Sequence, residues 1–127
     1  MKNIFIILIF IFTLLGCKKQ KSSSTKSLSG LYQRTVKNKG KSIAKVLIEY
    51  KNNKEVVFNI SVGTEEGCTG ELKGNLTINS ANEATFSSEE CEKLIFKFNK
   101  EQVEIIEENC FSSHGLKCSF NGTYLKE

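Results

Sequence analysis

Apolar residues recur at every second position along most of the chain beyond residue 30. The clearest runs are Val46, Ile48 and Tyr50, then Val56, Phe58, Ile60 and Val62, then Leu94, Phe96 and Phe98, and finally Val103 and Ile105. A period of two is typical of strands with one face in a core and the other in water, whereas a helix repeats every 3.6 residues. The pattern predicts eight strands, at 30–36, 43–50, 55–62, 69–78, 83–87, 93–98, 103–108 and 117–125.

Short polar turns at 52–53, 79–82 and 99–102 separate these strands. Such turns are typical of hairpins, so consecutive strands are expected to pair as an antiparallel meander. We therefore expect an all-β domain of about eight strands, closed into a barrel rather than folded as a two-sheet sandwich, because closure removes exposed strand edges. The repeated patterns Gly-Leu-Tyr at 30–32 and Gly-Thr-Tyr at 122–124 suit first and last strands that meet.

The first 16 residues have the features of a secretory signal peptide. Lys2 gives a positively charged start, and residues 4–15 are apolar except for Thr13. As a helix this run would span about 18 Å, whereas a bilayer core is roughly 30 Å thick. Its length therefore indicates a signal peptide rather than a membrane-spanning helix.

The sequence Leu-Leu-Gly-Cys at 14–17 resembles the lipobox of bacterial lipoproteins. The resemblance implies that the thiol of Cys17 receives a diacylglycerol, that the signal peptide is cut before it, and that the membrane is a partner through this lipid anchor. We therefore expect a signal peptide (1–16), a lipidated cysteine with a flexible tether (17–29) and a β domain (30–127). Because lysines and not acidic residues follow the cysteine, the resemblance favours the periplasmic face of the outer membrane.

The positive charge of the chain is concentrated outside the β domain. Of 18 basic and 14 acidic residues, five basic ones lie in the signal peptide or the tether, namely Lys2, Lys18, Lys19, Lys21 and Lys26. The domain is therefore close to neutral, and we expect no nucleic-acid partner, because that requires a basic face. The tether lysines suit the anionic headgroups of a membrane.

Four cysteines remain in the domain: Cys68, Cys91, Cys110 and Cys118. An even number in an exported domain predicts disulfide bonds. A zinc site is disfavoured, because the close cysteine pairs of zinc motifs are missing. Four cysteines allow three connectivities.

Hairpin register separates these connectivities in part. If Phe98 pairs with Val103 across the 99–102 turn, Cys91 lies opposite Cys110. We therefore favour Cys91–Cys110 together with Cys68–Cys118. Extending the 79–82 hairpin in the same way puts Cys68 opposite Lys93, close to Cys91. Cys68–Cys91 with Cys110–Cys118 thus stays open as the alternative.

The C-terminal stretch 110–124 contains a Cys…His-Gly…Cys-x-Phe-x-Gly-x-Tyr pattern. It resembles the ending of a set of small exported bacterial proteins, and with Cys68 and Cys91 the similarity covers about half of the chain. The resemblance implies a shared β fold and carries no activity with it.

Little in the sequence indicates catalysis. The chain has one histidine, His114, and no aspartate, and it lacks a Gly-x-Ser-x-Gly elbow for a nucleophile. We expect His114 to hydrogen-bond the backbone of its loop, and we predict no enzyme activity, no cofactor and no metal site. Acidic pairs Glu65-Glu66 and Glu89-Glu90 lie in loops near the cysteines and form a candidate contact patch.

These features predict a lipid-anchored binding or structural module of the cell envelope, with an envelope protein or a glycan as its partner. The alternative is an inhibitor of lysozyme-type hydrolases, since small β-barrel lipoproteins include such inhibitors and lysozyme is basic. The serine- and glycine-rich inhibitory loop of the membrane-bound inhibitor family is not recognisable in this sequence.

Overall fold

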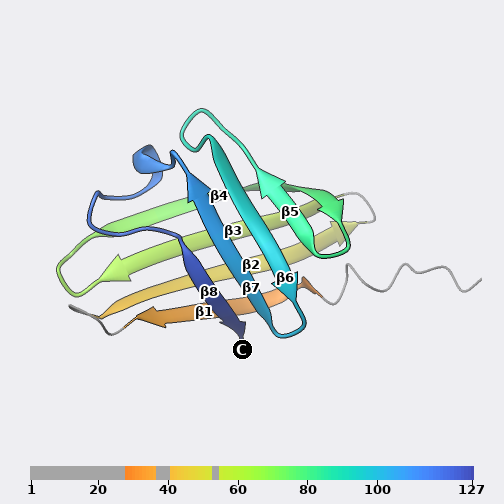
Figure 1. Cartoon of the computed structure of the whole chain (residues 1–127), viewed down its shortest axis with the longest axis horizontal. Coiled ribbons are helices and arrows are strands. Elements are labelled where there is room, and N and C mark those ends of the chain that lie inside the picture. Colours follow the sequence, from red (N-terminus) through yellow and green to blue (C-terminus); the bar gives the residue numbers. More distant parts are fainter. Residues whose placement is uncertain (1–27, 37–40, 53–54) are drawn as a thin grey trace, which may run out of the picture.

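The computed structural model describes residues 28–36, 41–52 and 55–127 (Figure 1). Cys17, the signal peptide and residues 17–27 of the tether lie outside these ranges. The strands are β1 (Gly30–Val36), β2 (Ser42–Asn52), β3 (Glu55–Thr64), β4 (Thr69–Ser80), β5 (Glu83–Phe86), β6 (Lys93–Asn99), β7 (Gln102–Glu108) and β8 (Gly122–Lys126), with a 3₁₀ helix η2 (Phe111–Ser113) between β7 and β8. Within the described residues no helix is long and apolar enough to cross a bilayer.

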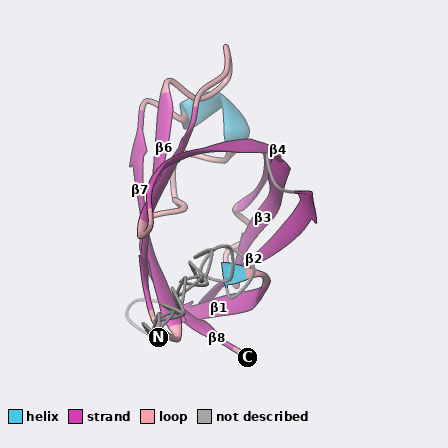
Figure 2. Cartoon of the chain, turned by 90° about the vertical axis from the view of Figure 1, so that its right-hand side faces the viewer, coloured by secondary structure: helices cyan, strands magenta, loops and turns pink. Residues whose placement is uncertain are grey.

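The strands form a closed antiparallel barrel in the order of the sequence, which confirms the predicted fold. Each strand pairs with the next, and β8 returns to β1, where Tyr32 lies opposite Lys126 and Gln33 opposite Leu125. Figure 2 looks into the barrel, with β6 and β7 on one side and β2, β3 and β4 on the other. Closure pairs both edge strands of the meander and so removes the free edges.

The barrel interior is filled by the side chains that the period of two points inward. The largest fully buried side chains are Tyr32, Tyr124, Phe96, Phe120, Ile48, Ile60, Leu94, Ile105, Val46 and Val103. Phe58 connects the two walls, because its ring lies 4.9 Å from that of Phe86 and 5.1 Å from that of Phe96, both edge to face. An eight-stranded barrel is just wide enough to be filled in this way. Ligands are therefore expected at its outer surface or its ends.

The first and last strands contain the same local arrangement of a glycine and a tyrosine. In each, a glycine at positive φ precedes a tyrosine by two residues, with φ 152° at Gly30 and 138° at Gly122. The tyrosine hydroxyls donate to carbonyls four residues earlier, those of Leu28 and Phe120. Burial raises the pKa of both hydroxyls, which keeps them protonated as donors.

Strands β1 and β8 each also place a cationic side chain over the tyrosine ring of the other strand. The guanidinium of Arg34 lies 5.5 Å from the ring centroid of Tyr124, and the ammonium of Lys126 lies 5.8 Å from that of Tyr32. The aliphatic stems cross the two glycines so closely that a Cβ would come within 2.6 Å of Arg34 and 2.8 Å of Lys126. The repeated pattern thus closes the barrel, as its position predicted, and the glycines make room for the crossing cations.

Two sequence-based expectations need correction. The last strand begins at Gly122 and not at residue 117, because residues 117–121 are held by side chains from other parts of the barrel. The β4–β5 hairpin also has an irregularity between Ile78 and Ser80, which shifts its register. The extrapolation that put Cys68 opposite Lys93 is wrong, because the β4–β5 ladder ends at Thr77↔Thr85 and the start of β4 lies beside His114 instead, where Gly70 forms an isolated bridge to it.

Candidate functional site at the disulfide end of the barrel

Two disulfides lie at one end of the barrel. Cys91 is bonded to Cys110, and Cys68 is bonded to Cys118. This is the connectivity that hairpin register favours. The β6–β7 ladder runs without interruption from Asn99↔Gln102 to Lys93↔Glu108, and it puts the next cysteines on either side within bonding reach. The second bridge fastens the start of β4 to residues 109–121, the connection from β7 to β8, which we call the 109–121 loop.

A buried hydrogen-bonded pair, His114 and Glu107, holds the same loop from inside. The imidazole Nε2 of His114 lies 2.8 Å and 3.0 Å from the two carboxylate oxygens of Glu107 on β7, and both side chains are almost entirely enclosed. The other ring nitrogen lies 2.7 Å from the carbonyl oxygen of Gly115, as the sequence led us to expect. The Glu107 carboxylate also accepts the backbone N–H of Phe120 at 2.9 Å.

This arrangement commits both nitrogens of His114 to acceptors. A carboxylate and a carbonyl can only accept, so the ring is held between an acceptor on each side. The ring is also packed edge to face against Phe120 at 5.1 Å. Nearby, Ser113 donates its hydroxyl to the carbonyl of Glu90. The contacts of His114 therefore describe a cross-link that holds the loop on the barrel.

The braced loop exposes large apolar side chains. Leu116 is 90% exposed and Phe111 is 64% exposed, although the loop between them is held by Ser113 and His114. Apolar groups on a rigid loop lose little conformational freedom on binding, which favours contact with a partner. Neither residue stood out in the sequence, because isolated apolar residues in a loop have no periodicity.

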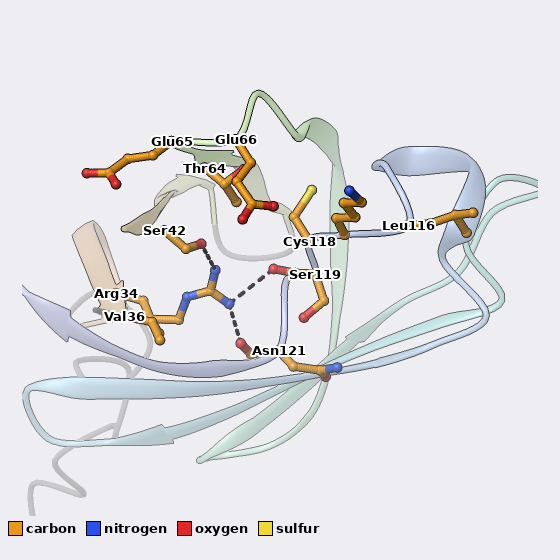
Figure 3. A pocket seen from close by; sticks show the side chains of 11 residues that line it. Arg34, Val36, Ser42, Thr64, Glu65, Glu66, Leu116, Cys118, Ser119 and Asn121 are labelled. Atoms are coloured by element: carbon orange, nitrogen blue, oxygen red, sulfur yellow. Dashed lines mark hydrogen bonds between the residues drawn. The ribbon is translucent and has the colours of Figure 1, made fainter. Parts of the chain in front are cut away.

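Beside this loop, a surface depression of about 460 Å³ opens over Arg34 (Figure 3). Arg34 is the only arginine in the chain and is 7% exposed. One of its terminal nitrogens donates to the carbonyls of Ser119, at 3.1 Å, and Asn121, and the other donates to the hydroxyl of Ser42 at 3.2 Å. Its Nε is buried and has no acceptor among the described residues.

The charges around the depression are balanced. Lys117 lines it together with the guanidinium, and Glu65 and Glu66 line it from the β3–β4 loop. In Figure 3 the side chain of Glu66 turns toward Arg34, whereas that of Glu65 extends away from it. None of the described carboxylates forms an ion pair with Arg34. The sequence reasoning missed this arginine, whose only signal was its place two residues after Gly30-Leu31-Tyr32.

The predicted acidic patch is divided between two places. Glu65 and Glu66 lie at the Arg34 depression, whereas Glu90 lines a separate one with Glu71 and Lys73. All four predicted residues, Glu65, Glu66, Glu89 and Glu90, are exposed. In the part of the chain that the structure describes, no group of three histidine, cysteine or glutamate side chains is placed to hold a metal ion.

Comparison with known proteins adds no relative to this picture. No family model matches the chain, and neither the curated proteins nor the solved structures contain a match. The resemblances to bacterial lipoproteins and to a set of small exported proteins therefore stay predictions from sequence motifs.

Proposed function

We propose that this chain is a lipid-anchored lipoprotein of a bacterial cell envelope, and that its disulfide-bonded barrel is a non-catalytic binding module. The 109–121 loop is the feature that supports the proposed binding role. It presents Phe111 and Leu116 to solvent, while a disulfide, the buried His114–Glu107 pair and a packed Phe120 hold its backbone. Exposed apolar residues on a fixed support are typical of contact sites, where a few buried side chains supply most of the binding energy.

The partner in this proposal is an envelope protein or a glycan that covers the loop. The filled barrel supports contact at the surface rather than a ligand enclosed by the strands, since bulky side chains occupy the interior. Alanine at both Phe111 and Leu116 would test the contact. It is designed to weaken capture of a partner without unfolding the barrel, because both side chains lie outside the core.

The anchor is supported by the lipobox-like sequence at 14–17 and by the polar tether that follows it. Lipid attached at Cys17 would hold the barrel at the periplasmic face of the outer membrane. Two or more acyl chains make such anchoring stable, at about 0.8 kcal/mol for each buried methylene.

Replacing Cys17 with serine is expected to abolish lipid attachment and leave the chain uncleaved from Met1, because the acyl acceptor is the thiol. Mass spectrometry of the N-terminal peptide measures both effects. The matched control is Cys68→Ser, which breaks a disulfide and leaves the lipid mass unchanged. A native chain that begins at Met1 with an unmodified thiol at position 17 would overturn the proposal.

A second candidate function is inhibition of lysozyme-type hydrolases. It is favoured by the exposed carboxylates of Glu65 and Glu66 beside the apolar Leu116, because a basic enzyme is attracted by carboxylates that surround an apolar contact. In a lysis assay at low salt, Glu65→Gln with Glu66→Gln is expected to inhibit less than the unchanged protein. No binding to lysozyme at low salt would exclude this candidate.

A further inference from the structure

Arg34 is a buried cation whose hydrogen-bonding capacity is only partly used. A guanidinium has five N–H donors, and three of them have acceptors in Ser119, Asn121 and Ser42. The Nε–H has none among the described residues. A buried charge without a counter-charge is costly, and an unpaired buried donor adds to that cost.

The donors left over are the Nε–H and one N–H of the terminal nitrogen that reaches Ser42. Because Nε is buried and the terminal nitrogens bond Ser42, Ser119 and Asn121, an oxyanion in the depression would meet the positive charge of the terminal nitrogens rather than an open edge. The depression of about 460 Å³ opens at this residue. An oxyanion that entered it would supply the missing counter-charge in surroundings of reduced polarity, where the attraction is stronger than in water.

The opposite wall of the depression carries negative charge. Glu66 turns toward Arg34 in Figure 3, and Glu65 lies next to it in the chain. A simple anion would be attracted by Arg34 and Lys117 and repelled by these two carboxylates. A ligand with an oxyanion and an ammonium a short distance apart matches both walls at once.

We propose that the depression between the buried Arg34 and the carboxylate of Glu66 binds a small zwitterion of the α-amino-acid type. The carboxylate of the ligand faces Arg34, its ammonium faces Glu66, and an apolar side chain lies against Val36 and Leu116, which also line the depression. The inference deepens the proposed binding role. It needs neither the anchor at Cys17 nor a partner at Phe111, so its failure would leave both of those standing.

Titration of the full chain in mild detergent tests the proposal, with leucine as the probe and amide chemical shifts as the readout. Two compounds each carry one of the two charged groups of leucine: 4-methylpentanoate lacks the ammonium, and 3-methylbutylamine lacks the carboxylate. We expect leucine to bind more tightly than either, with the largest shifts at Arg34, Thr64 and Ser119. Equal binding of leucine and 4-methylpentanoate would indicate an anion site rather than a zwitterion site and would overturn the proposal. An absence of leucine binding would overturn it as well.

A charge-neutral variant gives the second arm of the test. Glu66→Gln is expected to weaken leucine binding about twofold to fivefold, the range for a partly exposed ion pair, and to strengthen the binding of 4-methylpentanoate. Glu66 is exposed, so the variant is designed to fold. The matched control is Glu89→Gln, which removes an exposed carboxylate away from the residues that line the depression. Equal effects of Glu66→Gln and Glu89→Gln would contradict the assignment.

Discussion

Replacing Glu107 with alanine is expected to lower the free energy of unfolding by about 2–5 kcal/mol, the cost of leaving two enclosed donors without their acceptor. The carboxylate accepts from the imidazole of His114 and from the backbone N–H of Phe120. Without it both donors stay enclosed and lose their acceptor. Urea unfolding at neutral pH measures the change.

The adjacent residue provides a matched control for this variant. Glu108→Ala removes the same group one position along β7, where the side chain is exposed, and is expected to change stability by about 0.5 kcal/mol or less. Glu107→Gln is expected to fall between the two, because its amide oxygen still accepts one hydrogen bond. Equal losses for the alanine variants at 107 and 108 would show that the buried pair does not hold the loop.

Replacing Cys68 and Cys118 together with alanine is expected to cost about 4 kcal/mol. The bridge joins residues 50 positions apart in the sequence, and a cross-link that closes a long loop removes more entropy from the unfolded chain than one that closes a short loop. The Cys91–Cys110 bridge closes a loop with a separation of 19, for which the same reasoning gives about 3 kcal/mol.

The double variant also separates the two braces of the 109–121 loop. Without Cys118 the loop keeps the His114–Glu107 pair, so we expect the barrel to remain folded and the segment around Leu116 to become mobile. Unfolding in urea gives the stability, and hydrogen exchange gives the local effect. A variant as stable as the unchanged protein, with equal protection at residues 115–118, would contradict this account.

The strands and the Cys91–Cys110 bridge were predictable because both depend on local pattern. A strand directs alternate side chains to one face, so the period of two is enough to assign inward positions such as Phe58 and Phe96. A tight hairpin keeps its register until a bulge intervenes, and β6–β7 has none over its ladder. The β4–β5 hairpin shows the limit of this reasoning, since β5 ends at Phe86 and its ladder stops well before Cys68, which the extrapolation had placed opposite Lys93.

The candidate sites depended on contacts that no local pattern encodes. His114 was expected to bond the backbone of its loop, and it does so at Gly115, but its pairing with Glu107 depends on how the loop folds back onto β7. No sequence motif marked Arg34 as a site residue, and its only signal was its position four residues after Gly30. Its burial, its unpaired Nε and the carboxylate of Glu66 above it follow from barrel closure, which brings β1, β8 and the β3–β4 loop together.

The amino-acid sequence was therefore sufficient for the all-β class, the antiparallel order of the strands, the side chains that fill the core and the register that places Cys91 opposite Cys110, because each follows from neighbours in the chain or across a hairpin. Only the tertiary structure placed the one arginine opposite a carboxylate and enclosed the one histidine with Glu107. The surroundings of Arg34 depend on barrel closure, which brings β1 next to the segment before β8, and the His114–Glu107 contact depends on how the 109–121 loop folds back onto β7.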